Sequence, residues 1–208
     1  VDSPELAGIV RAQSLEYRNQ IYGTRLSGIA VSARFDGSRL EIERLVADAG
    51  QGSVSASGFV SLSSQSGYPM DLAARLDNAR LARSDTVSAR ATGELRLTKQ
   101  AGETALLAGE IRLPETRYRI VRQGAAEVTE LEGVRFRAEA GPRRITGGES
   151  ATPGPGLLGK VRLDVSLIAP DQLYVSGMGL ESEWSADLGL KGTSADPRVS
   201  GTIALVRG

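Results

Sequence analysis

Few residues of this chain are of the types that perform chemistry. The 208 residues include no Cys and no His, which excludes thiolate and imidazole metal ligands, a Cys nucleophile and a Ser-His relay. The carboxylates Asp71, Asp77, Asp164 and Asp187 are scattered singly. A glycosidase needs two carboxyl groups about 5 to 10 Å apart. No local motif brings two of these carboxylates together, although the sequence leaves such a pair open.

One segment matches a cofactor motif letter for letter. Gly154, Gly156 and Gly159 have the G-x-G-x-x-G spacing of dinucleotide-binding proteins. That motif works where it follows a strand and opens a helix whose amide groups face a pyrophosphate. Here Pro155 lacks an N–H, and the segment follows a Gly/Pro-rich stretch and leads into a strand pattern. We interpret the match as accidental and predict no cofactor, no metal and no catalytic residue.

The composition narrows the classes of partner. Lys plus Arg and Asp plus Glu number 25 each, and aromatic residues make up 4%. A chain without net charge does not attract polyphosphate, and few aromatic rings are present to stack on bases. These two observations argue against a nucleic-acid partner. No apolar run approaches the roughly 18 residues of a membrane-spanning helix.

The polar residues belong to segments that alternate like half-buried strands. Over residues 160–167, Val161, Leu163, Val165 and Leu167 fall on one face and polar residues on the other. Residues 173–180, 184–190 and 199–205 repeat this alternation, with Trp184 in series with Leu188 and Leu190. We therefore interpret Trp184 as a core aromatic rather than a sugar platform. Antiparallel strands with one apolar face form a sheet that must cover that face.

The first half of the chain continues the strand pattern. Residues 6–22 read as extended, with room for a short helix, and the Asp36-Gly37 pair predicts a hairpin between 26–35 and 40–47. The step from Ile42 to Leu45 breaks the alternation by one residue, which predicts a bulge near Glu43. Further strands are predicted at 70–76, 86–97, 105–113, 117–122 and 134–138.

A glycine recurs inside several of these strands. Gly58, Gly93, Gly109 and Gly201 are each followed by apolar residues two and four positions on. We place these glycines on the polar face and predict a tight bend or coiling of the sheet at each. Their spacing is uneven, which excludes a fixed-period solenoid.

Two basic or flexible features lie in the middle of the chain. Residues 141–159 are rich in Gly and Pro and predict a mobile surface loop. A series of arginines alternates with apolar residues and is interpreted as a solvated face, the alternative being a basic patch for anionic headgroups. This series comprises Arg117, Arg119, Arg122, Arg135 and Arg137.

The C-terminal third resembles a known family. Residues 175–181, 188–193 and 196–201 carry the series V-x-G-x-G-L-acidic, L-x-L-x-G-T and D-P-x-x-x-G. These are similar to the TamB C-terminal domain family, within the wider AsmA-like translocation and assembly module family; Ser176 departs from it, where relatives often carry Arg. The match is strong over about forty residues.

The resemblance implies a fold and a function. The implied fold is all-β: a long, curved, mostly antiparallel sheet coiled into a taco-like groove, here a single domain over 1–208 of a longer protein. The implied function is a periplasmic lipid conduit for phospholipid acyl chains, without enzymatic activity, which supports outer-membrane protein assembly. The implied partner is a TamA-like outer-membrane protein, and the implied anchor is an N-terminal inner-membrane segment absent from this sequence.

Alternation predicts which side chains line such a groove. One alternative function is an assembly chaperone that binds nascent outer-membrane strands by β-augmentation. Another is a closed sandwich or lipocalin-like binding module with sealed edges. The predicted lining residues are Leu40, Ile42, Val60, Leu62, Leu72, Leu76, Leu95, Leu97, Ile111, Leu113, Phe136, Leu163, Val165, Leu167, Val175, Trp184, Leu188, Leu190, Ile203 and Leu205.

Overall fold

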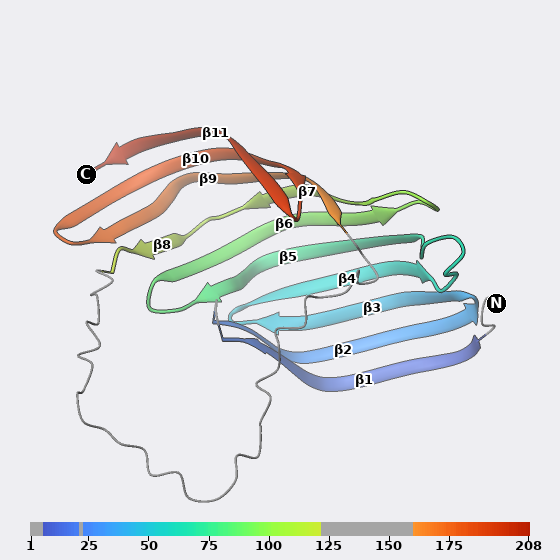
Figure 1. Ribbon diagram of the computed structural model, residues 1–208. Coiled ribbons are helices and arrows are strands. Elements are labelled where there is room, and N and C mark those ends of the chain that lie inside the picture. Colours follow the sequence, from blue (N-terminus) through green and yellow to red (C-terminus); the bar gives the residue numbers. More distant parts are fainter. Residues whose placement is uncertain (1–5, 21–22, 122–159) are drawn as a thin grey trace, which may run out of the picture.

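The computed structural model describes residues 6–20, 23–121 and 160–208, which form one eleven-stranded sheet (Figure 1). These residues contain no helix, so the predicted all-β class is confirmed and residues 6–22 begin as a strand. The strands are β1 (Leu6–Asn19), β2 (Thr24–Gly37), β3 (Arg39–Ala49), β4 (Gly52–Ser61), β5 (Met70–Arg83), β6 (Val87–Lys99), β7 (Ala105–Arg112), β8 (Thr116–Arg119), β9 (Val161–Gly177), β10 (Leu180–Thr193) and β11 (Asp196–Arg207).

The strands follow one another in chain order across the sheet. The order is β1-β2-β3-β4-β5-β6-β7-β9-β10-β11, and the pairs are antiparallel except on one side of β9. There β7 and then β8 pair with β9 in parallel, so β8 continues the line of β7 between β6 and β9. A parallel pair needs a connection of a dozen or more residues, and residues 120–160 supply that length. The predicted loop 141–159, Arg122 and the predicted strand 134–138 lie outside the described residues.

Two local predictions in the first half are confirmed. The β2–β3 hairpin turns at Gly37 and Ser38, directly after Asp36. The register between β3 and β4 shifts between Ile42 and Leu45, because Glu43 and Arg44 together oppose a single residue of β4. The bulge restores the inward direction for Leu45, which explains the one-residue break in the sequence pattern.

Cross-strand register gathers the apolar residues into continuous rows. Residues directly opposite in a ladder project from the same face, so each row can be followed from strand to strand. The first row comprises Val10, Ala33, Ile42, Gly58, Leu72, Leu97, Leu107 and Leu163. The second comprises Ala12, Val31, Leu45, Ala56, Ala74, Leu95, Gly109, Val165, Leu190 and Val199. The third comprises Ala47, Val54, Leu76, Gly93, Ile111, Leu167, Leu188 and Gly201.

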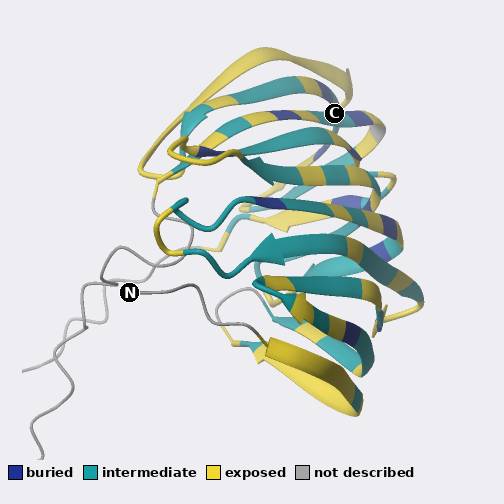
Figure 2. Ribbon diagram, turned by 90° about the vertical axis from the view of Figure 1, so that its right-hand side faces the viewer, coloured by how far each residue is buried: buried dark blue, intermediate teal, exposed yellow. Residues whose placement is uncertain are grey.

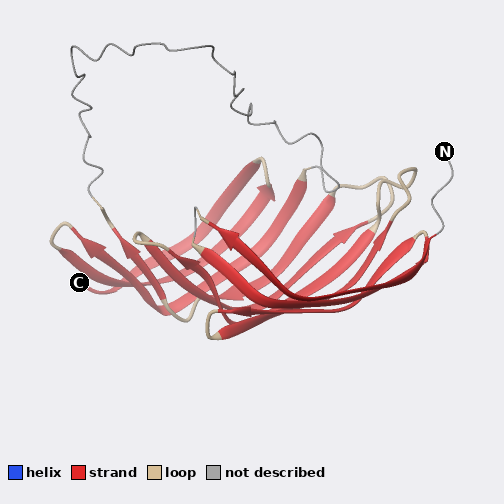
Figure 3. Ribbon diagram, turned by 90° about the horizontal axis from the view of Figure 1, so that it is seen from below, coloured by secondary structure: helices blue, strands red, loops and turns tan. Residues whose placement is uncertain are grey.

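Next to the third row, a line of irregularities crosses the sheet. Ser14, Gly28 and Asn78 have positive φ angles of 61°, 58° and 46°, and register shifts occur beside each of them. Another shift lies between Trp184 and Ala186. We call this line the crease. Seen from below, the sheet is a curved layer (Figure 3).

Alanines occupy the apolar face along the crease. Their exposures are 0% at Ala49, Ala79 and Ala91, 2% at Ala169 and 7% at Ala186. No second layer covers this face in the described residues, so the sheet's own side chains must close over these alanines. That requires the sheet to bend toward its apolar face, and only a methyl group fits inside the bend.

The predicted polar-face position of the recurring glycines is wrong. Register places Gly58 between Ile42 and Leu72, and Gly109 between Leu95 and Val165, all on the apolar face. The prediction fails because a residue two positions from an inward apolar residue in a strand also faces inward. The bend itself is supported by φ angles of 136° at Gly58, 155° at Gly93, 150° at Gly109 and 137° at Gly201.

Candidate functional site

Apolar side chains line the apolar face of the sheet but do not pack into a closed core. Eight of its twelve buried hydrophobic residues are alanines, and no large side chain is fully buried among the described residues. Most large side chains of the three rows, such as Leu95, are half-buried. Figure 2 shows this intermediate burial over most of the sheet, and exposure over nearly all of β1 and all of β11. A close-packed sandwich core would instead bury its large side chains.

The structure brings most of the predicted lining residues to this one face. Leu62 and Leu113 directly follow β4 and β7, and Phe136 lies outside the described residues. Those within the main part of the sheet are Leu40, Ile42, Val60, Leu72, Leu76, Leu95, Leu97, Ile111, Leu163, Val165, Leu167, Leu188 and Leu190. Those at or beyond the crease are Val175, Trp184, Ile203 and Leu205. Their role as lipid contacts remains a prediction.

Several residues of the same rows were missed. Leu45, Val54 and Leu107 are large apolar members of the rows and were not predicted as lining. Val54 and Ala56 alternate with three serines, and this alternation predicts that their side chains face inward. Leu45 was obscured by the bulge, which moved it out of phase with Ile42.

Trp184 lies beyond the crease with its ring half-buried. Its Nε1–H donates to the Ser182 hydroxyl oxygen at 2.8 Å, and that hydroxyl donates to the Val175 carbonyl oxygen at 3.3 Å. Its neighbours across the ladder are Leu173 and Leu205. The indole is therefore held by its own strand pair with its polar atom satisfied, in an apolar row.

The opposite face of the sheet carries polar side chains, several of which form ion pairs. Arg75 and Glu94 are 3.1 Å apart, and Arg34 and Glu41 are 3.0 Å apart. Leu95 also contributes to a hollow of about 700 Å³. The lining also includes Leu45, Ala56, Ala74 and Gly109 of the second row, and the other lining residues carry their side chains on the polar face. Those polar-face residues are Glu43, Arg44, Val46, Ser55, Ser57, Ala73, Arg75, Glu94, Arg96 and Ala108.

The four candidate carboxylates are not gathered into a pair. Asp71 accepts hydrogen bonds from Arg96, Asp164 lies opposite Lys191, and Asp187 lies opposite Ile168. Asp77 lies opposite Ser53 in β4. Within the described ranges, no cluster of three or more Asp or Glu side chains is arranged to hold a metal ion.

The Asp71–Arg96 pair gives a testable pH dependence. Arg96 donates from Nε at 2.8 Å and from Nη2 at 2.5 Å, and these hydrogen bonds hold the pKa of Asp71 below its ordinary value. A depressed folded-state pKa stabilises the fold above the unfolded-state pKa, and this contribution is lost as pH falls through the folded-state pKa. We expect Arg96→Gln to move the Asp71 carboxyl titration, followed by carbon-13 NMR, to higher pH. An unchanged titration would show that the ion pair is absent in solution.

Comparison with known proteins identifies the family. No curated protein and no solved structure matches the chain significantly. No helix of the described residues has the length and apolar character needed to cross a membrane. The TamB C-terminal domain matches residues 43–208, which include all three apolar rows from β4 onward. Because the match covers most of the chain, this chain belongs to the TamB C-terminal domain family.

Proposed function

We propose that the apolar face is a conduit for phospholipid acyl chains. The family is the C-terminal domain of TamB-like proteins, which take part in outer-membrane assembly. These proteins form a non-enzymatic transport and assembly module of the cell envelope. The observation that carries the proposal is the three continuous rows of half-buried apolar side chains. The second row runs from edge to edge, and the first and third each cross eight strands, so an acyl chain could slide from one strand to the next without leaving apolar surroundings.

The energetics favour such a surface. Each methylene exposed to water costs about 0.8 kcal/mol, or on the order of 12 kcal/mol for a sixteen-carbon chain. Neighbouring strands are about 4.8 Å apart, so the second row, which crosses ten strands, is roughly 45 Å long. The bend at the alanine crease brings apolar side chains toward a chain lying on the rows. The polar headgroup can remain in water at the open side.

The proposal includes the setting of the protein. A conduit of this kind would act in the periplasm, between an inner-membrane anchor elsewhere in the full-length protein and a TamA-like outer-membrane partner. The absence of catalysis belongs to the same proposal. It is supported by the scattered carboxylates and by a sequence without Cys or His.

A photo-crosslinking amino acid placed at single positions in the full-length protein tests the conduit in cells. At Leu95, in the second row, we expect adducts whose added mass is that of a phospholipid. At the adjacent Glu94, on the polar face, we expect few or none, because its side chain points into water. Equal lipid adducts at both positions, or none at Leu95, would contradict the conduit.

The edge strands favour a second candidate, a chaperone for unfolded outer-membrane proteins. All twelve residues of β11 are exposed, and β1 is exposed over nearly its whole length. Each of these strands pairs with a single neighbour in the described part of the sheet. An unpaired edge can accept a client strand by β-augmentation. Polypeptide adducts from a crosslinker at Ser200 in β11, without lipid adducts at Leu95, would favour this candidate over the conduit.

A further inference from the structure

The β3–β4 hairpin stops short of its neighbours and leaves a notch beside it. The hairpin turns at Ala49 to Gly52, whereas β2 begins at Thr24 and β5 continues to Arg83. Beyond the turn β2 and β5 therefore meet directly, and the Thr24 hydroxyl donates to the Leu81 carbonyl oxygen at 2.5 Å. The strand ends concerned lie together at one side of the sheet (Figure 1). The notch has a volume of about 330 Å³ and is lined by Gly23, Arg25, Ser27, Gly50, Arg80 and Arg83.

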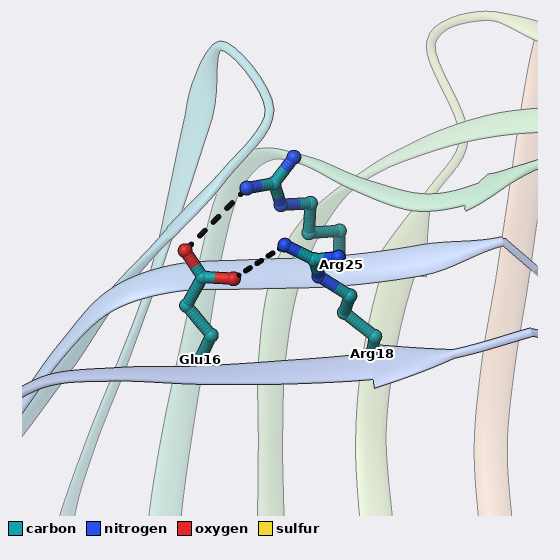
Figure 4. Close-up of polar contacts among 3 residues, drawn as sticks. All are labelled: Glu16, Arg18 and Arg25. Atoms are coloured by element: carbon teal, nitrogen blue, oxygen red, sulfur yellow. Dashed lines mark hydrogen bonds and ion pairs between the residues drawn. The ribbon is translucent and has the colours of Figure 1, made fainter.

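Three guanidinium groups line the notch, and no carboxylate does. Arg25 contacts Glu16 at 3.4 Å, but Glu16 is closer to Arg18, at 2.8 Å (Figure 4). Arg80 and Arg83 form no ion pair with any described residue. Asp48 lies directly opposite Ser27 and projects from the same face, but it is not part of the lining. Like charges around a small hollow repel one another, which favours binding of an anion.

The two glycines of the lining keep the notch open. Gly50 has a φ of +73°, and a Cβ there would lie 3.0 Å from the Arg80 Cβ. Gly23 has a φ of +65°, and a Cβ there would lie 1.9 Å from the Arg83 carbonyl oxygen. Any side chain at either position would intrude on the arginines. Because neither position carries a side chain, a ligand can approach the backbone and the guanidinium groups together.

The notch also lies beside the apolar face. Leu26 and Leu81 are next in sequence to Arg25 and Arg80, so their side chains project from the opposite, apolar face. There both pack against the apolar cluster that contains Ala49, Leu76 and Ala79. A ligand with an anionic head among the arginines could reach the apolar face with its tail by crossing the sheet at the end of the β3–β4 hairpin.

We propose that the notch binds a phosphate group. Arginine forks match the oxygen geometry of phosphate and form paired, charge-assisted hydrogen bonds with it. The Ser27 hydroxyl supplies a further donor on the same lining. The phosphate comes either from a phospholipid headgroup, which rests on the proposed lipid conduit, or from a free phosphate ester. The volume is at the small end for ligand sites, which suits a headgroup rather than a larger molecule.

NMR titration of the isotope-labelled 208-residue domain, confirmed folded by dispersed amide signals, separates these sources. The probes are inorganic phosphate, glycerol 3-phosphate and dihexanoyl phosphatidylglycerol below its micelle concentration. We expect saturable shifts of the Gly23 and Gly50 amides with all three, weakened by added salt. The double variant Arg80→Gln/Arg83→Gln should weaken binding at least tenfold. Arg112→Gln, which alters an exposed arginine outside the notch, should leave it unchanged.

The outcomes distinguish the notch from the conduit. Tighter binding of the lipid than of glycerol 3-phosphate, with added shifts at Leu26 and Leu81, supports a headgroup site. Equal affinities support the phosphate site with a free ester as its ligand. No saturable shift with any probe, or the same affinity in the double variant, overturns the notch while lipid adducts at Leu95 still support the conduit.

Discussion

Replacing Leu95 by Arg should abolish phospholipid binding while leaving the domain folded. Leu95 lies in the second apolar row between Ala74 and Gly109, and it is only half-buried. A guanidinium there can bend its flexible stem toward water, as arginines do at apolar surfaces. An acyl chain crossing the site would nevertheless pass a charge, at a penalty of several kcal/mol where the site is dry. Copurified phospholipid, measured by native mass spectrometry, should fall at least tenfold.

Two further variants show why Leu95 is informative. Glu94→Arg places the same charge on the adjacent polar face, where the side chain is 74% exposed and its ion pair with Arg75 is worth less than about 1 kcal/mol. It should retain the lipid. Leu76→Arg changes a residue that is only 6% exposed and packed at the crease, so it should unfold the domain. If Leu95→Arg also unfolds the domain, the face is a closed core. If folded Leu95→Arg carries lipid normally, the rows are not the conduit.

The sequence predicts the faces of the sheet better than its shape. Alternation places Leu163, Val165 and Leu167 correctly, and even the bulge at Glu43 follows from a break in the pattern. These features depend on neighbours in the chain, which the sequence shows directly. The parallel pairing of β7 with β9 depends on the path of the residues between them, and no local pattern encodes that path.

The crease and the notch are harder to predict from the sequence because each is formed by several strands together. Ala49, Ala79 and Ala91 are ordinary small residues until the register places them in one line. Arg25 and Arg80 are 55 positions apart and meet only because the hairpin between them is short. Apolar alternation identifies the apolar face, whereas the arginine-lined notch depends on the strand lengths and pairings.

The glycines inside the strands should be the positions where the smallest substitution has a large effect on stability. In Gly109→Ala, the new Cβ would lie 2.1 Å from the Glu94 carbonyl oxygen of the neighbouring strand, at a φ of +150°. Backbone strain of this kind costs about 1 to 3 kcal/mol for residues other than glycine. The clash adds to it, because it can be relieved only by moving the ladder between β6 and β7. We expect a loss of more than about 3 kcal/mol, which lowers Tm by more than about 6 °C in a domain of this size.

Gly102→Ala separates the clash from the strain. Gly102 has a φ of +74° in the turn after β6, and a Cβ there meets no atom within 4 Å. It should cost only the intrinsic penalty of the left-handed conformation, about 1 to 2 kcal/mol. Calorimetric melting of both variants therefore measures the close approach of the strands at Gly109. Equal losses in Tm would mean that the strands can separate freely there, and that the bend of the sheet does not depend on the missing side chain.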